Sequence, residues 1–177
     1  IARRQRQMCI RDRIEPRQDA PESYKPTLIS NRPGGLTMHD EISNALTNSD
    51  SFDISVAFVS PDAILSLFED FRSHHANAPD QVSRLITSTK NHFNDPRAFW
   101  ELLHLQRTAG VDVRVWAGSD SSVSVAQGQP FHPKGYVFSR RMRNGTPYYD
   151  LFVGSSNLTG AALNTQREWN LKVSSLA

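Results

Sequence analysis

Phe131-His-Pro-Lys-Gly-Tyr-Val-Phe138 and Phe152-Val-Gly-Ser-Ser-Asn157 are the two stretches that decide the fold of this chain. Side chains alternate along a strand, so His132 and Lys134 face the same side of a strand that begins there. Asn144-Gly145 lies between the two stretches and favours a tight turn, which predicts a hairpin. The hairpin returns the chain to His132 and places a hydroxyl and an amide beside the imidazole and the ammonium. Its predicted strands are 135–141 and 148–154.

The rest of the chain alternates apolar strands with amphipathic helices. Short apolar runs rich in β-branched residues, together with a final apolar run, predict strands at 53–60, 82–88, 111–116 and 169–174. Caps or prolines that precede apolar residues at helical spacing predict helices after Thr37, after Pro61 and after Asp95-Pro96, with a short helix at 158–163. This order predicts an α/β fold with a mixed, largely parallel sheet flanked by helices on both faces.

We interpret the three tryptophans and one histidine pair as structural rather than functional residues. Trp100, Trp116 and Trp169 are expected in the core. The pair His74-His75 ends a helix, where a positive charge is favourable, and we interpret it in that way rather than as a metal pair.

The positive net charge of the chain comes from its first residues. Six arginines against Asp12 and Glu15 give residues 1–17 a net charge of +4, so residues 18–177 carry −2 of the total of +2. Bulk charge therefore gives the folded part no general affinity for nucleic acid. We expect residues 1–35 to be a disordered or artefactual tail and a lead-in loop. One domain is expected at 36–177, truncated at its C-terminus.

Composition excludes several classes of protein. The single cysteine, Cys9, excludes a disulfide framework or a cysteine zinc site within the chain. No apolar run approaches the 18 residues or so that a membrane span needs, and no signal-peptide pattern is present. We therefore expect a cytoplasmic protein with no membrane partner.

The hairpin residues resemble the phospholipase D superfamily. The similarity is carried by Phe131–Phe138, Phe152–Leu163 and Asn164–Asn170, and Phe52–Ser60 fits the first core strand. More narrowly, these stretches are similar to the phospholipase D-like nuclease domains of restriction endonucleases and of DEAD/DEAH-type helicases. The resemblance covers residues 36–174 and implies a phospholipase D-like half, because the motif occurs once.

The resemblance implies a metal-independent attack on a phosphodiester, with no cofactor. His132 would be the nucleophile that forms a phosphohistidine, or the acid/base partner of that nucleophile. Lys134 and Asn157 would bind phosphoryl oxygens, with help from Ser155. Glu168 would accept a hydrogen bond from the far ring nitrogen of His132 and so fix its tautomer. The alternatives are that Ser155 and Asn157 cap the following helix and that Glu168 pairs with a neighbouring cation.

A single motif is chemically half a site, so the resemblance implies a symmetric homodimer in which two half-sites meet. One position departs from the superfamily pattern, because Ser139 stands where an aspartate is usual. Asp150 is a possible substitute. The departure weakens the expectation of activity and leaves the expectation of fold unchanged.

Four basic residues are candidate contacts for a DNA backbone. Three of them lie at the hairpin, where the alternative is that they keep a sheet edge soluble. The fourth is in a loop that follows a strand at the end where ligands bind in such sheets. They are Arg140, Arg141, Arg143 and Lys90.

Three functions are consistent with the sequence. The first is a DNA phosphodiesterase that serves as one module of a restriction or helicase system. The second is a phosphodiesterase that acts on a lipid or small phosphoester. The absence of an amphipathic basic helix that could bind a membrane surface argues against it. The third is a nucleic-acid-binding module with weak or no catalysis, which the loss of the motif aspartate favours.

Overall fold

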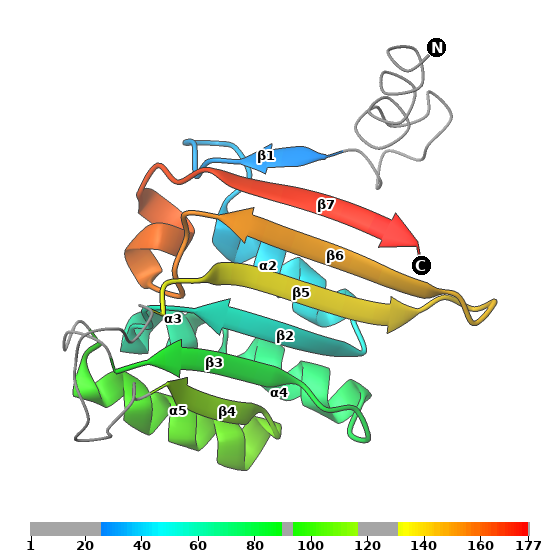
Figure 1. Cartoon of the computed structure of the whole chain (residues 1–177), viewed down its shortest axis with the longest axis horizontal. Helices are drawn as coiled ribbons and strands as arrows, with labels where there is room; N and C mark the ends of the chain where they lie inside the picture. Colours follow the sequence, from blue (N-terminus) through cyan, green and yellow to red (C-terminus); the bar gives the residue numbers. More distant parts are fainter. Residues whose placement is uncertain (1–25, 90–93, 117–130, 177) are drawn as a thin grey trace, which may run out of the picture.

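One sheet organises the protein. The computed structural model describes residues 26–89, 94–116 and 131–176, and in these ranges seven strands pair in the order β1-β7-β6-β5-β2-β3-β4 (Figure 1). The strands are β1 (Thr27–Ile29), β2 (Ser51–Val56), β3 (Arg84–Ser88), β4 (Asp112–Trp116), β5 (Lys134–Arg141), β6 (Pro147–Gly154) and β7 (Asn170–Leu176).

The sheet is mixed, as predicted, but it is mostly antiparallel rather than largely parallel. β2 is parallel to β3 and β3 to β4, whereas the other four pairings are antiparallel. β5 and β6 are joined by a turn too short for a crossover, and such a connection joins antiparallel neighbours. The longer connection from β6 to β7 contains η3 and also returns the chain antiparallel. The predicted hairpin of β5 and β6 is confirmed, and Gly145 in its turn has a φ of 85°, which suits glycine.

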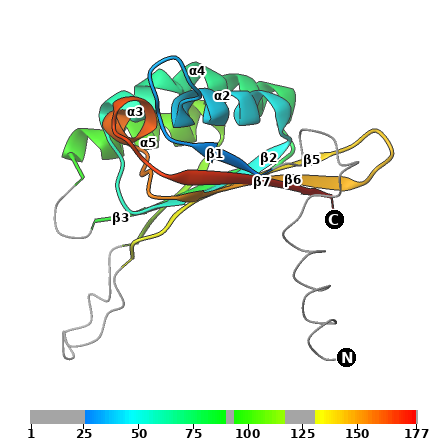
Figure 2. The ribbon, with the colours of Figure 1, turned by 90° about the horizontal axis from the view of Figure 1, so that it is seen from above.

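All the described helices lie on one face of the sheet (Figure 2). The prediction of helices on both faces is therefore wrong for the described residues. The other face is called the open face below. Exposed side chains of the antiparallel strands lie on it, among them Leu151, Val153 and Leu171. An antiparallel sheet tolerates one uncovered face. The helices are α2 (Met38–Asn48), α3 (Pro61–Ser66), α4 (Phe68–Asn77), α5 (Pro96–Ala109) and the π-helix η3 (Ala161–Thr165).

The core lies between the sheet and this single helix layer. Alternate residues of the central strands are buried, among them Phe52, Ile54, Tyr136, Phe138 and Phe152, and they pack with the apolar faces of the helices. The tryptophans do not join them, contrary to the prediction: Trp100, Trp116 and Trp169 are 70%, 50% and 75% exposed.

The helix ends follow the predicted capping chemistry. Thr37 Oγ1 accepts a hydrogen bond from the Asp40 N–H (3.1 Å), and an Asp95 oxygen accepts one from the Arg97 N–H (2.9 Å). Gly110 ends α5 in the left-handed conformation. The expected helix after Pro61 is divided in two at Leu67. None of the described helices has the length and apolar character needed to cross a bilayer.

A short strand lies within the stretch expected to be a lead-in loop. β1 pairs antiparallel with β7. Asn31, just after β1, fixes this segment: its Nδ2 donates to the carbonyls of Ala162 and Gln166 (both 2.8 Å), and its Oδ1 accepts from the Met38 N–H (2.9 Å). Three residues are too few to show a strand period in the sequence, so the segment was not predictable from its pattern. The basic N-terminal stretch lies outside the described residues.

His74 is buried, contrary to its interpretation as a favourable positive charge at a helix end. Its Nδ1 lies 3.0 Å from the Leu46 carbonyl oxygen and its Nε2 lies 3.0 Å from Ser83 Oγ. Burial lowers the pKa of this imidazole, and the Leu46 carbonyl and Asp50 oppose that effect. A neutral ring satisfies both contacts, with one nitrogen donating to the carbonyl and the other accepting from the hydroxyl.

We expect the free energy of unfolding to fall as the pH drops below about 6.5. The unfolded chain binds a proton at the ordinary histidine pKa, whereas the folded chain binds it only at a lower pH. Stability that is complete above 6.5 is therefore lost progressively toward the lowered pKa. Urea unfolding at a series of pH values measures this slope. The His74→Gln variant should show a shallower slope, and an unchanged slope would contradict the assignment.

Candidate active site

Six strands bring their ends to one edge of the sheet, called the site edge below. β2, β3, β4 and β6 end there, and β5 and β7 begin there, as their pairing directions require. The residues at these strand ends are Val56, Ser88, Trp116, Gly154, Lys134 and Asn170. The two predicted motifs therefore meet at the same edge.

His132 and Lys134 lie together at the start of β5. The backbone there is fixed by the Ala57 N–H, which donates to the Pro133 carbonyl (3.0 Å) and so extends the β2–β5 pairing. Lys134 Nζ lies 2.9 Å from His132 Nδ1 and 3.3 Å from Nε2. An ammonium only donates, so the ring nitrogen that it contacts must present a lone pair. That lone pair is engaged by the ammonium here, and it can attack an electrophile only when Lys134 turns to another acceptor.

Phe58 connects the imidazole to the second motif. Its ring lies edge-on to the His132 ring, with centroids 5.7 Å apart and an interplanar angle of 77°. Its N–H donates to Asn157 Oδ1 at 3.2 Å. The side-chain oxygen of Asn157 is therefore occupied by this hydrogen bond. The side-chain NH2 group is left to donate to a phosphoryl oxygen. Sequence reasoning missed Phe58 as a site residue, although it lies in the apolar run that resembles the first core strand.

Ser156 is the buried anchor of the turn after β6. Its N–H donates to Asn170 Oδ1 (3.1 Å), its hydroxyl donates to the Ala162 carbonyl (3.1 Å), and its own carbonyl accepts from the Tyr136 hydroxyl (3.0 Å). Asn170 Nδ2 in turn donates to Ser156 Oγ (2.8 Å). Sequence reasoning missed Ser156 and Asn170, because no local pattern shows that these two side chains pair.

Glu168 contacts Ser155 rather than His132. Its carboxylate accepts a short hydrogen bond from the Ser155 hydroxyl, whose oxygen also accepts from the Trp169 N–H (3.0 Å). Within the described ranges, no hydrogen bond joins Glu168 to His132. The role of Glu168 in orienting the imidazole therefore stays a prediction.

The charges at the site edge influence one another. Burial lowers the pKa of Lys134, and the Glu168 carboxylate opposes this shift. Burial, and secondarily the same carboxylate, raises the pKa of Tyr136, which therefore stays a neutral hydrogen-bond donor to the Ser156 carbonyl. The described residues contain no group of three or more His, Cys, Asp or Glu side chains placed to hold a metal ion.

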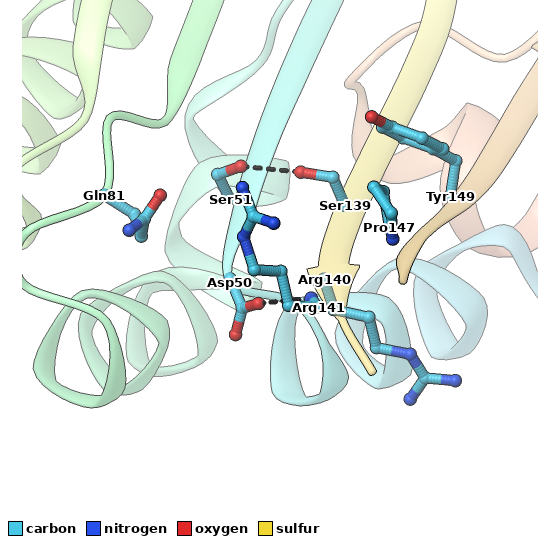
Figure 3. A pocket seen from close by; sticks show the side chains of 8 residues that line it. All are labelled: Asp50, Ser51, Gln81, Ser139, Arg140, Arg141, Pro147 and Tyr149. Atoms are coloured by element: carbon cyan, nitrogen blue, oxygen red, sulfur yellow. Dashed lines mark hydrogen bonds between the residues drawn. The ribbon is translucent and has the colours of Figure 1, made fainter. Parts of the chain in front are cut away.

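The predicted arginine contacts lie at the opposite edge of the sheet. β5 runs away from Lys134, so Arg141 lies seven residues further, roughly 23 Å along the strand. There, Arg140 and Arg141 line a hollow of about 180 Å³ together with Ser51 and Ser139 (Figure 3). Arg143 follows in the hairpin turn.

The other predicted residues are also away from His132 or outside the described ranges. The Ser139 hydroxyl lies 2.7 Å from that of Ser51 at the far edge. Asp150 lies within β6 and accepts from the hydroxyls of Tyr148 and Ser174, so its carboxylate is engaged there rather than at the site edge. Lys90 lies outside the described residues.

Comparison with known proteins shows the fold. No family model and no curated protein matches the sequence. NucT from Helicobacter pylori is similar over 84% of this chain and 84% of its own, with a TM-score of 0.56 and 16% sequence identity. Nuc from Salmonella typhimurium, a phospholipase D family member, is similar over 84% of this chain and 83% of its own, with a TM-score of 0.53 and 14% identity. The chain has the phospholipase D fold.

This fold requires a close approach of backbone at the second motif. A side chain on Gly154 would collide with the Trp169 carbonyl oxygen and with Asn170, at the point where β6 ends beside the start of β7. Gly135, in the neighbouring strand, has open space where its side chain would be. Position 135 therefore has room for a side chain, and position 154 does not.

We expect Gly154→Ala to destabilise the protein by about 1–3 kcal/mol, because the backbone must shift to admit the methyl group. Gly135→Ala is the matched control and should change the free energy of unfolding by less than about 0.5 kcal/mol. Denaturant unfolding of both variants measures the difference. Equal effects of the two substitutions would contradict the close approach.

Proposed function

We propose that this chain is a metal-independent phosphodiesterase that cleaves DNA through a phosphohistidine intermediate. The observation that carries the proposal is the convergence of His132, Lys134 and Asn157 around Phe58 at the site edge. Their groups are a nucleophile, a fixed positive charge and a neutral donor. These are the groups needed to attack a phosphodiester and to stabilise the charge that develops on it.

In the first step, a ring nitrogen of His132 attacks phosphorus with its lone pair. The bond from phosphorus to the leaving oxygen breaks, and the leaving oxygen takes a proton from a second, protonated imidazole. Lys134 and the Asn157 NH2 group donate to the non-bridging oxygens as negative charge builds up there. Ser155 lies beside them and donates to Glu168.

In the second step, the second imidazole removes a proton from water, and the water oxygen attacks phosphorus. The phosphorus–nitrogen bond breaks and His132 regains its lone pair. This scheme needs two imidazoles at one phosphorus. In the described part of the chain, His132 is the one imidazole in contact with Lys134. We therefore include in the proposal a symmetric dimer whose two site edges face each other.

DNA and a restriction or helicase system come from the sequence resemblance alone. Arg140, Arg141 and Arg143 are too far along β5 to contact the phosphodiester held by Lys134, so their proposed contacts would be to the backbone several nucleotides away. The hollow between Arg141 and Ser51 offers room for such a contact.

The proposal predicts cleavage of plasmid DNA in the presence of EDTA. We expect His132→Ala to abolish cleavage, because it removes the nucleophile. His104→Ala is the matched control: His104 is exposed on α5 and packs on Phe68, so its loss should leave cleavage unchanged. Agarose gel assays of nicking measure all three proteins. Cleavage that persists in His132→Ala would overturn the mechanism, and salt-sensitive DNA binding by a wild-type protein without cleavage would favour the binding-module alternative.

The dimer predicts that the His132→Ala protein inhibits the wild-type protein. A mixed dimer has one imidazole at each phosphorus and lacks either the nucleophile or the acid, so excess variant should lower wild-type cleavage in proportion to the mixed dimers formed. Cleavage rates are measured across mixing ratios after the subunits have exchanged. The His104→Ala protein, mixed in the same way, should not inhibit. A wild-type rate that is independent of added His132→Ala protein would show that one chain suffices.

A further inference from the structure

Two of the exposed tryptophans lie at the site edge. Trp169 follows Glu168 directly and Trp116 ends β4. Trp100 is exposed on α5, in the helix layer. Exposed aromatic side chains beside a proposed catalytic group are candidates for contact with a nucleic-acid substrate, because bases stack on aromatic rings.

Trp116 already forms half of an aromatic stack. Its ring lies nearly parallel to that of Phe131, with centroids 6.1 Å apart and an interplanar angle of 16°. Phe131 precedes His132 directly. Trp116 pairs with Ser88 in the β3–β4 ladder. It is two residues from Arg114, which lines a hollow on the open face, so the two side chains share that face. The stacked pair therefore stands on the β4 side of His132, at the open face. Lys134 faces the helix layer instead, because it pairs with buried Val56 and is two residues from buried Tyr136.

Trp169 stands on the opposite side of His132. It is opposite Ser155, because the Ser155 N–H donates to the Trp169 carbonyl (3.1 Å) and the Trp169 N–H donates to Ser155 Oγ (3.0 Å). It is two residues from Leu171, which is exposed on the open face, so alternation places the two side chains on the same face. The strand order places β5 and β2, with His132 at their junction, between β7 and β4.

A hollow on the open face lies across β2, β3, β4 and β5, and its lining includes Arg114, two residues before Trp116. It has a volume of about 330 Å³ and an apolar floor that includes Ile86 and Val137, with open space over Gly135. Arg84 and Arg114 line it. Each is paired with an aspartate, but both side chains are more than half exposed, and such surface pairs are weak enough for a phosphate to compete.

We propose that the aromatic side chains at the site edge bind unpaired bases on both sides of the scissile phosphodiester. One base stacks on Trp169, and another stacks on the Trp116–Phe131 pair, beside the hollow that Arg114 lines. The strand crosses the site edge, so that its phosphodiester reaches Lys134 while the flanking bases lie against the open face. The substrate class is therefore single-stranded nucleic acid. This inference rests on the proposed function, since His132 defines the scissile position.

The chemistry of stacking excludes a paired duplex from this surface. In a duplex each base is covered above and below by its neighbours, so a side chain cannot lie against its face unless the base leaves the stack. Separate aromatic platforms next to a cationic group suit a flexible strand whose bases splay apart. Stacking does not depend on base identity, so it gives no sequence preference.

Binding is tested in proteins that also carry His132→Ala, because the metal-independent wild-type protein would cleave the probe. Each tryptophan variant is compared with the His132→Ala protein that keeps all its tryptophans. Fluorescence anisotropy of labelled oligodeoxythymidylate should show that Trp169→Ala and Trp116→Ala each weaken binding about 10-fold, the usual effect of one stacked base. Trp100→Ala is the matched control and should bind as the His132→Ala protein does. A duplex of the same length should bind more weakly than the single strand and should respond little to any of the three substitutions.

Hydrolysis of bis(p-nitrophenyl) phosphate separates this inference from the proposed function. The small diester reports the phosphodiesterase alone: the wild type and Trp100→Ala should hydrolyse it at the same rate, whereas His132→Ala should not hydrolyse it. A wild-type protein that fails to hydrolyse any phosphodiester overturns the proposed function. Trp169→Ala and Trp116→Ala variants that bind the single strand as tightly as the His132→Ala protein overturn the stacking surface.

Two further measurements exclude other reasons for lost binding. If an alanine variant fails to fold, Trp169→Phe and Trp169→Leu decide: the phenyl ring should retain most of the affinity, and the leucine should not. Sedimentation of each variant reports the oligomeric state. Loss of a dimer in Trp169→Ala, with a proportional loss of DNA binding, would show that this ring contacts a second copy of the chain and would overturn the inference.

Discussion

The pairing of Val59 with Leu158 holds the site together. The two residues form an isolated parallel bridge beyond the ends of β2 and β6. Its hydrogen bonds run from the Leu158 N–H to the Phe58 carbonyl (3.1 Å) and from the Ser60 N–H to the Leu158 carbonyl (3.0 Å). β2 and β6 are not neighbours, because β5 lies between them, and His132 and Pro133 lead into β5 at this point. The bridge therefore closes the site edge over the start of β5.

Several features of the site follow from this closure. With residues 58–60 beside residue 158, the Phe58 N–H reaches Asn157 and the Phe58 ring reaches His132. Asn94, which precedes α5, joins the same segment to the end of β3, since its Oδ1 accepts from the Val59 N–H (2.8 Å) and its Nδ2 donates to the Ser88 carbonyl (2.5 Å). The side chains proposed to be catalytic are thus held by backbone contacts of buried neighbours, which limit movement more than exposed side-chain contacts do.

The uncovered face of the sheet is the second constraint on function. Helices on one face alone make a core from one set of alternating residues and leave the other set at the surface (Figure 2). The aromatic side chains at the site edge and the hollow beside β4 belong to that exposed set. The proposed stacking surface and the core therefore use opposite faces of the same strands.

Local sequence determined the β5–β6 hairpin, the caps of α2 and α5, and the proximity of His132 to Lys134. Each of these depends on residues within a few positions of one another, where strand alternation, turn preference and capping act directly. Only the tertiary structure decided that Phe58 meets Asn157, that Asn170 pairs with Ser156, that the helices share one face, and that the arginines of the hairpin lie far from His132. Phe58 and Asn157 are 99 residues apart. A contact of that range depends on which strands become neighbours in the sheet, and no local preference of the chain encodes that choice.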